Sequence, residues 1–163
     1  AMVPQIVDAV DVPVLAAGGI ADGRQAAAAF MLGAQGIQVG TRFLVAKECT
    51  ISEIYKERIL KSKDTDTIVT GRRTGDAVRA LKSPFSREFA KQEADLSISE
   101  ESLQALGTGA LRKAAREGDL EHGCFLAGQV ASMVKKEQTC AEIIEDLFSG
   151  AETALKGASK WIR

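Results

Sequence analysis

The sequence has few cysteines, few aromatic residues and no excess of charge of either sign. Its three cysteines, Cys49, Cys124 and Cys140, stand far apart without a CxxC pattern. This spacing argues against a disulfide framework and against a zinc site. Aromatic residues make up 5% of the chain, and the net charge is −1. A nucleic-acid binder needs a clustered basic excess, so this composition disfavours that class.

Long apolar runs are missing as well. No segment approaches the ~18 consecutive apolar residues of a membrane span, and no charged-then-apolar signal segment opens the chain. The near-neutral charge gives no electrostatic case for binding an anionic membrane surface. Since reduced thiols are the default, we expect a cytoplasmic protein with neither a membrane nor a nucleic-acid partner.

Two glycine turns near the start are the clearest motif that is present. Ala16-Ala17-Gly18-Gly19-Ile20 closes one short apolar run, and Gln38-Val39-Gly40-Thr41-Arg42 closes the next. Each turn leads into residues typical of a helix. They look like the last two strand-to-helix turns of a (β/α)₈ barrel, where that fold commonly holds a phosphate group. Both turns lie so near residue 1 that we expect most of a barrel to precede them.

Hydrophobic spacing predicts a strand–helix–strand unit around these turns. Helical spacing over 3–10 is followed by a predicted strand over 11–16, a helix over 23–32 with Asp22 as its N-cap, and a strand over 36–40. A crossover of this kind makes the two strands parallel. Parallel strands are normally covered on both faces, which two strands cannot achieve alone.

The remainder of the chain is mostly helical in pattern. We expect a helix over 52–60 capped by Ser52, a strand over 67–70, irregular structure with short helical pieces over 71–102, and helices over 103–117, 124–135 and 139–160, the last capped by Thr139.

The predicted fold class is α/β, the C-terminal part of a TIM barrel. Residues 1–50 would hold its last two βα units, and residues 51–102 a barrel-end helix and a lid-like excursion. Residues 103–163 would form C-terminal helices that pack back on the barrel. The alternative is an independent α-rich domain with one βαβ unit.

An ordered series of motifs resembles the enoyl-acyl-carrier-protein reductase II family. It begins with Pro13-Val14-Leu15-Ala16-Ala17-Gly18-Gly19-Ile20-Ala21-Asp22-Gly23 and Gln38-Val39-Gly40-Thr41-Arg42-Phe43, and it continues through 77–82, 107–111 and 127–131. A lone Gly-Gly turn would be a weak signal, whereas this series runs through essentially the whole chain. The family is the FMN-dependent enoyl reductase of bacterial fatty-acid synthesis, and it is related to the nitronate monooxygenases.

The resemblance implies a flavoprotein that reduces the 2,3 double bond of an enoyl thioester carried by acyl carrier protein, with NADH or NADPH as the hydride donor. Glycine lets the backbone approach closely, and backbone N–H groups at helix N-termini bind anions. The FMN phosphate would therefore lie on the two turns, at Ala17, Gly18, Gly19, Gln38, Val39, Gly40 and Thr41. Gly128 and Gln129 resemble a family segment that returns to the flavin pocket; alternatively, they belong to a small-residue helix packed on the barrel.

The resemblance assigns no catalytic residue to this chain. The family's histidine lies in a glycine-rich loop upstream, so the N-terminal part of the same barrel is expected as a required partner, together with a homodimer. His122 is the only histidine, and we interpret it as an exposed loop residue. No residues show metal-ligand spacing.

Several basic residues have two interpretations each. Arg42 is either a structural ion-pair residue or a phosphate ligand. A local basic cluster is either a solvated face or a surface that steers the acidic acyl carrier protein. The members of this cluster are Arg72, Arg73, Arg79 and Lys82.

Three other functions remain open. Nitronate monooxygenase shares the barrel and the flavin but passes electrons to oxygen. A non-redox phosphate-binding barrel enzyme would share the two glycine turns but not the pattern over 107–163. The chain could also be a binding or regulatory half that never catalyses.

Expressed alone, this chain is expected to aggregate and to lose FMN, because its two strands would expose unpaired edges. Size-exclusion chromatography and flavin absorbance would measure both properties. A soluble monomer that unfolds cooperatively would contradict the expectation.

Overall fold

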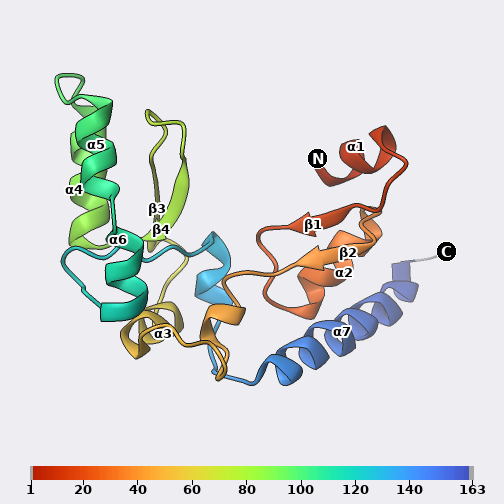
Figure 1. Cartoon of the computed structure of the whole chain (residues 1–163). Coiled ribbons are helices and arrows are strands. Elements are labelled where there is room, and N and C mark those ends of the chain that lie inside the picture. The colour runs from red at the N-terminus through yellow and green to blue at the C-terminus, as the bar shows by residue number, and fades with distance from the viewer. Residues whose placement is uncertain (1, 162–163) are drawn as a thin grey trace. The chain divides into compact units, whose positions relative to one another are not determined.

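The computed structural model describes residues 2–161, which divide into two compact units (Figure 1). The first unit combines the start of the chain, up to Glu48, with its end, from Glu137. The second unit is the intervening segment, Cys49–Lys136. Among residues 2–161, none of the helices combines the length and the apolar character that crossing a bilayer demands.

The first unit is built on one βαβ crossover. Its strands β1 and β2 are parallel, with Leu15 opposite Gly36 and Ala17 opposite Gln38, so the predicted parallel pairing is confirmed. Both strands are shorter than predicted. The elements are α1 (Met2–Ala9), β1 (Leu15–Ala17), α2 (Gly23–Met31), β2 (Gly36–Gln38), a 3₁₀ turn (Phe43–Val45), α7 (Cys140–Gly157) and a terminal 3₁₀ turn (Ala158–Trp161).

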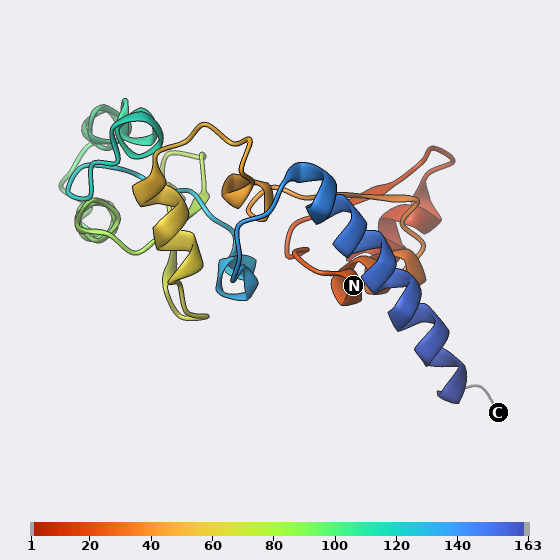
Figure 2. The same cartoon turned by 90° about the horizontal axis from the view of Figure 1, so that it is seen from below.

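Helix α7 packs along α2 (Figure 2). The buried face of α7 carries Ile143, Leu147 and Ala151 at the i, i+4 spacing of an amphipathic helix. Small residues let the two helices approach closely, since a Cβ placed on Gly23 would lie 2.3 Å from the backbone carbon of Gly150. Helix α2 therefore needs glycine at its first position for steric reasons.

The chain leaves and re-enters the first unit at one place. Ala46 and Gln138 form a parallel β-bridge, and the backbone N–H of Lys47 donates to the carbonyl of Gln138 at 2.9 Å. The Glu48 carboxylate accepts from the N–H of Cys140, at 3.0 and 2.9 Å to its two oxygens. These contacts close the loop that contains the whole second unit.

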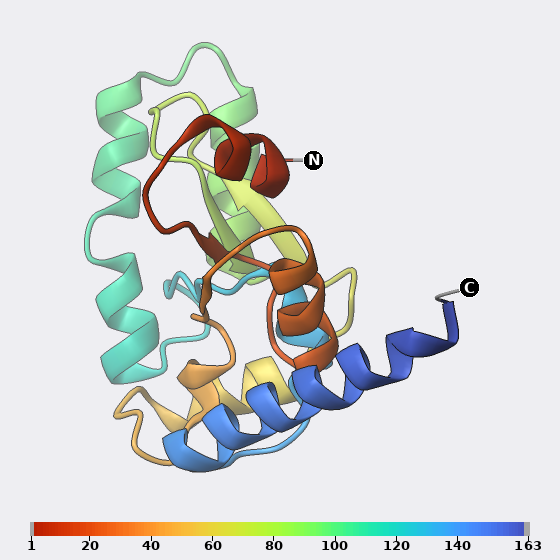
Figure 3. The ribbon, with the colours of Figure 1, turned by 90° about the vertical axis from the view of Figure 1, so that its right-hand side faces the viewer.

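The second unit combines an antiparallel hairpin with short helices. Strands β3 and β4 pair from Thr67 opposite Leu81 to Thr70 opposite Val78, and β3 packs against α4 (Figures 1 and 3). The elements are α3 (Glu53–Leu60), β3 (Thr67–Thr70), β4 (Val78–Leu81), α4 (Pro84–Ala94), α5 (Glu100–Gly107), α6 (Ala110–Arg112), a π-helical turn (Lys113–Glu117) and a 3₁₀ turn (Gln129–Met133).

An aromatic pair fixes α3 within this unit. The Tyr55 ring meets Phe125 edge-on with centroids 5.0 Å apart, and its hydroxyl donates to the carbonyl of Leu126 at 2.6 Å. Arg58 covers the Phe125 ring, with its guanidinium carbon 4.7 Å from the centroid. Burial raises the pKa of Tyr55 far above its ordinary value, so the hydroxyl stays a donor.

Most predicted helix starts are confirmed. Asp22, Ser52 and Thr139 each accept backbone N–H bonds as N-caps. The prediction of irregular structure with short helical pieces over 71–102 missed regular elements, because this range holds β4, the whole of α4 and the start of α5. Ser83 caps α4 with Pro84 at its first position, a start signal that the polar composition obscured.

The helix predicted over 124–135 is wrong. The backbone N–H of Leu81 donates to Phe125 at 2.8 Å, and the N–H of Ala127 donates to the carbonyl of Arg79 at 3.1 Å. The hairpin thus provides backbone hydrogen-bond partners for this apolar run, which is extended. Only Gln129–Met133 within it forms a 3₁₀ turn. The helix predicted over 103–117 is broken after Gly107, where α5 ends.

We expect Gly23→Ala in the full-length protein to lower the free energy of unfolding by about 1–3 kcal/mol through overpacking against α7. Gly157→Ala is the matched control. A Cβ there has nothing within 4 Å, and relief of glycine's backbone entropy gives about 0.5–1 kcal/mol of stabilisation. Urea unfolding measures both, and equal effects of the two variants would contradict the role of the close contact.

Candidate functional site

The first glycine turn follows β1 directly. Gly18 and Gly19 have φ of +96° and +71°, the left-handed region that L side chains rarely adopt. A Cβ on either residue would meet nothing within 4 Å, so both face open space. Glycine is required here by the backbone, and it also leaves the main chain accessible.

The second glycine turn follows β2. The carbonyl of Gly40 accepts from the N–H of Phe43 at 2.9 Å and starts the 3₁₀ turn there. Gly40 does not have a positive φ, and a Cβ on it would also meet nothing within 4 Å. Within the described residues, there is therefore room for a side chain at Gly40.

The parallel register brings the two turns together. Ala17, the last residue of β1, lies opposite Gln38, the last residue of β2. Both turns therefore leave the same edge of the strand pair, and the residues predicted on each turn become neighbours across the strands. Ala17 and Gln38 are both exposed.

The start of α2 is capped by its own side chains. Asp22 Oδ1 accepts from the N–H groups of Arg24 and Gln25, at 2.9 and 3.2 Å, and Gln25 Oε1 accepts from the N–H of Ala21 at 2.8 Å. These first-turn amides are already bonded. An anion at this edge would therefore meet the amides of Gly18 and Gly19 rather than those of Arg24 and Gln25.

A fork of two bonds neutralises the carboxylate next to the turn. Arg24 donates from Nε and Nη2 to Asp22 Oδ2, at 3.0 and 2.6 Å. Burial alone would raise the pKa of Asp22, but the bonds from Arg24 and from the Gln25 backbone bring that pKa below its usual range. The pair leaves little net negative charge beside the glycines.

Arg42 is buried behind the second turn. Its Nη2 donates to Gln138 Oε1, and Gln138 Nε2 donates to Asp146 Oδ2 at 2.8 Å. Burial lowers the pKa of Arg42 below its ordinary value, and the charge of Asp146 offsets only part of this effect. Arg42 Nη1 has no hydrogen-bond partner within residues 2–161. The guanidinium thus links the Gly40-Thr41 turn to the start of α7.

Gly128 and Gln129 lie in the second unit. Gly128 is extended, and Gln129 begins the 3₁₀ turn that follows. Neither residue lies in an α-helix, and Gln129 belongs to a short 3₁₀ turn that includes Ala131 and Ser132. Their role in cofactor binding stays a prediction.

The remaining candidate residues have structural surroundings. His122 is exposed and pairs through Nδ1 with Asp119 Oδ2 at 3.0 Å, which confirms its interpretation as a loop residue. All three cysteines are free, and burial raises the pKa of Cys124. Across the described part of the chain, no group of three His, Cys, Asp or Glu side chains could hold a metal ion.

Two members of the predicted basic cluster, Arg73 and Lys82, have different surroundings. Arg73 donates to the carbonyls of Glu93, Asp95 and Ile98, so its guanidinium serves the second unit's own structure. Lys82 instead borders a hollow of about 290 Å³. The other basic residues around it are Arg58, Lys61 and Arg87. Sequence inspection missed this group because its members lie in and just after α3, just after β4, and in α4.

Comparison with known proteins identifies the family. Residues 1–150 match the family model described as nitronate monooxygenase, and the chain belongs to this family. It is similar to a probable nitronate monooxygenase of Staphylococcus aureus (strain JH9), with 43% identity over 129 residues, 78% of this chain and 36% of that protein.

Two solved structures share its fold. FabK from Thermotoga maritima matches with a TM-score of 0.94 and 38% identity, over 99% of this chain and 51% of that one. A nitroalkane oxidase from Streptomyces ansochromogenes matches with a TM-score of 0.78 and 29% identity, over 96% and 44%. The resemblance to the reductase II family and an α/β fold of this TIM-barrel group are thereby confirmed. The chain spans about half the length of these relatives, or less.

We expect Asp22→Ala in the full-length protein to cost about 1 kcal/mol of stability at neutral pH through loss of the cap. The folded pKa of Asp22 is lowered, so its contribution is complete above the unfolded pKa of about 3.9. It disappears as the pH falls through the folded pKa. Urea unfolding between pH 7 and pH 3 should show the variant approaching wild type in acid. Asp11→Ala, at an exposed position, is the control, and a gap that stays constant with pH would refute the capping role.

Proposed function

We propose that this chain is the C-terminal portion of an FMN-dependent enoyl-acyl-carrier-protein reductase. The observation that carries the proposal is the pair of glycine turns at one strand edge, each facing open space. In this proposal β1–α2 and β2 with its following turn are the last two βα units of the barrel. The N-terminal part of the same barrel supplies the remaining strands.

The residues present fit the phosphate of FMN. Open space in front of Gly18, Gly19 and Gly40 lets an anion reach the main chain, and oriented backbone N–H groups bind phosphate. Thr41 adds a hydroxyl donor, while Ala17, Gln38 and Val39 border the site. Gly128 and Gln129 are proposed as further cofactor contacts.

In this proposal the chain's own residues bind and orient the cofactor, and they do not transfer protons. The Arg42–Gln138–Asp146 link holds the second turn in place, and the Asp22–Arg24 pair reduces repulsion of the phosphate. Bound FMN would supply two-electron transfer from NADH or NADPH to the enoyl thioester. The net reaction converts enoyl thioester, NAD(P)H and one proton into saturated thioester and NAD(P)⁺. The proton donor is proposed to be a histidine of the N-terminal part.

Similarity to FabK, an enoyl-acyl-carrier-protein reductase II, supports the reductase. FabK has both a higher TM-score and a higher sequence identity to this chain than the nitroalkane oxidase has. Nitronate monooxygenase is the second candidate, favoured by the family model and by the names of the curated relatives. A homodimer is proposed from the resemblance alone, and its test is the mass of the full-length protein in solution.

Acyl carrier protein is the proposed macromolecular partner. Four cationic side chains and the single carboxylate of Asp66 border the hollow around Lys82, which suits an acidic protein surface. Rising salt should then raise KM for a substrate on acyl carrier protein but not for the same acyl group on pantetheine. Equal salt dependence would reject this docking surface.

The reaction is tested with the purified full-length protein. We expect NADH or NADPH to be consumed with crotonyl thioester, and no oxygen uptake with an alkyl nitronate. Reaction with the nitronate alone would reject the reductase in favour of the monooxygenase. A colourless protein without flavin absorbance would reject both and favour a non-redox phosphate-binding barrel.

Gly40→Val tests the cofactor site separately. The new side chain would block the approach of the phosphate to the turn, and loss of a hydrogen bond to a charged group costs about 1.5–3 kcal/mol. FMN affinity should therefore fall about 10- to 100-fold, as measured by flavin fluorescence titration. The urea midpoint of the apoprotein should not fall, because the added Cβ meets nothing within 4 Å; unchanged FMN affinity would exclude Gly40 from the site.

A further inference from the structure

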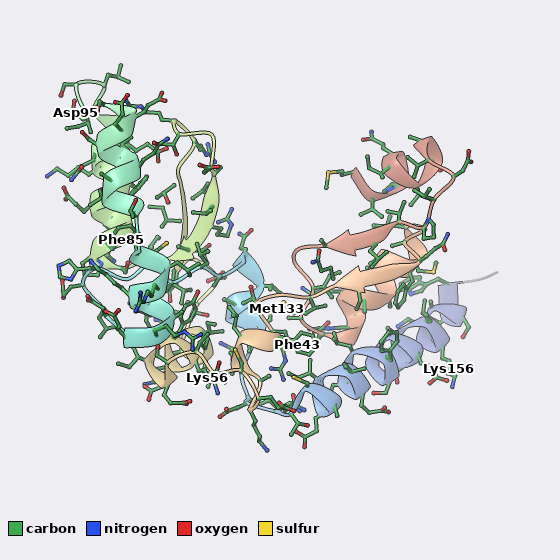
Figure 4. The ribbon with its side chains drawn as sticks, in the orientation of Figure 1. Phe43, Lys56, Phe85, Asp95, Met133 and Lys156 are labelled. Atoms are coloured by element: carbon green, nitrogen blue, oxygen red, sulfur yellow. The ribbon has the colours of Figure 1, made fainter. Side chains whose placement is uncertain are left out.

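A second hollow in the second unit, of about 340 Å³, lies between the β3–β4 hairpin and helices α4 and α5. Its volume is near the lower end of the roughly 300–1,000 Å³ typical of small-ligand pockets. All of its lining residues belong to this unit. Figure 4 labels Phe85 and Asp95 near the two ends of the α4 region that borders the hollow.

The walls of this hollow are apolar. Phe85, Phe89 and Leu103 line it from the helices, and Cys124 and Leu126 line it from the extended segment. The first four belong to one buried hydrophobic cluster, and Leu126 packs against that cluster. A ligand in the hollow would therefore touch the side of a packed core.

The polar groups of the hollow offer little to a charged ligand. The Thr74 hydroxyl donates to the carbonyl of Gly71 at 3.2 Å, and the Thr108 hydroxyl donates to Gln104 at 2.8 Å. No lysine or arginine is among its lining residues, and its one ionisable oxygen group is the carboxylate of Asp76. Phosphate groups, including those of a nicotinamide dinucleotide, lack a cation here.

Reciprocal hydrogen bonds hold the hairpin loop at the edge of the hollow. The Glu93 carboxylate accepts from the N–H groups of Gly71 and Arg73, at 3.2 and 2.9 Å. The Arg73 guanidinium donates back to the carbonyls of Glu93, Asp95 and Ile98, at 3.1, 2.9 and 2.7 Å. The hollow is thus framed before any ligand arrives, which lowers the entropic cost of binding.

We propose that this hollow binds the hydrocarbon chain of the acyl group of the substrate. The inference rests on the proposed function, because an enoyl thioester presents an uncharged alkyl tail beyond its double bond. An apolar, cation-free hollow of this size takes such a tail and rejects the phosphates of the other reactants. Each methylene that enters should tighten binding about fourfold until the hollow is filled.

Gly107 provides the variant that fills the hollow. It ends α5, it lines the hollow, and a Cβ on it would lie at an ordinary 3.5 Å from Phe89 Cε2. Its φ is not positive, so a larger residue strains no backbone. Gly157 ends α7 in the same way, and a Cβ there meets nothing within 4 Å. Gly107→Leu and Gly157→Leu are therefore matched.

Calorimetric titration of the full-length holoprotein with saturated acyl-pantetheine thioesters of four to ten carbons measures the tail separately from turnover. Wild type and Gly157→Leu should gain affinity with chain length. Gly107→Leu should lose that gain, binding the ten-carbon thioester at least tenfold more weakly than wild type.

Affinity that is independent of chain length in wild type would overturn the proposal, as would a chain-length dependence that survives in Gly107→Leu. The first result is also expected if the preceding part of the protein fills the hollow. Failure of the proposed function appears elsewhere, as absence of crotonyl-thioester reduction by wild type. A reductase without chain-length dependence would retain the function and reject the pocket.

Discussion

The parallel pairing of β1 with β2 is the constraint on which the rest of the first unit depends. One register decides that Ala17 and Gln38 end their strands side by side, and hence that both glycine turns leave the same edge. A parallel pair requires a crossover, which α2 provides. The crossover helix is in turn fixed on α7 by the backbone approach of Gly23 to Gly150. The strand register and the packing of α2 on α7 therefore both act on the residues around the two glycine turns.

Charged side chains around the turns are hydrogen-bonded to other side chains or to main-chain amides. Asp22 uses the first amides of α2 and is paired with Arg24. Arg42 is directed to Gln138 behind the second turn. These side chains therefore stabilise the edge, and an anion approaching the glycines would meet main-chain groups. Binding through main chain fits a cofactor better than a varied substrate, because it recognises phosphate and little else.

The sequence predicted those features whose causes are local. Two short apolar runs ending in glycine gave the strand pair, and Asp22, Ser52 and Thr139 gave the helix starts, since caps act within three residues. The extended course of Phe125 could not be predicted, because its backbone partner is Leu81 in the hairpin. The partnership of Arg42 with Gln138 likewise depends on folding. Both hollows of the second unit are lined by residues from several elements, so no spacing in the sequence predicts them.

The bridge between Ala46 and Gln138, with the bond from Lys47, makes the second unit an insertion whose two ends meet. Closing such a loop costs an entropy that grows only slowly with its length, so the inserted segment can gain, lose or exchange residues while the strand edge keeps its register. The inserted segment and the strand edge are thereby open to separate evolution within one polypeptide. A protein engineer could replace the segment as a cassette between Glu48 and Glu137 and leave the two glycine turns undisturbed.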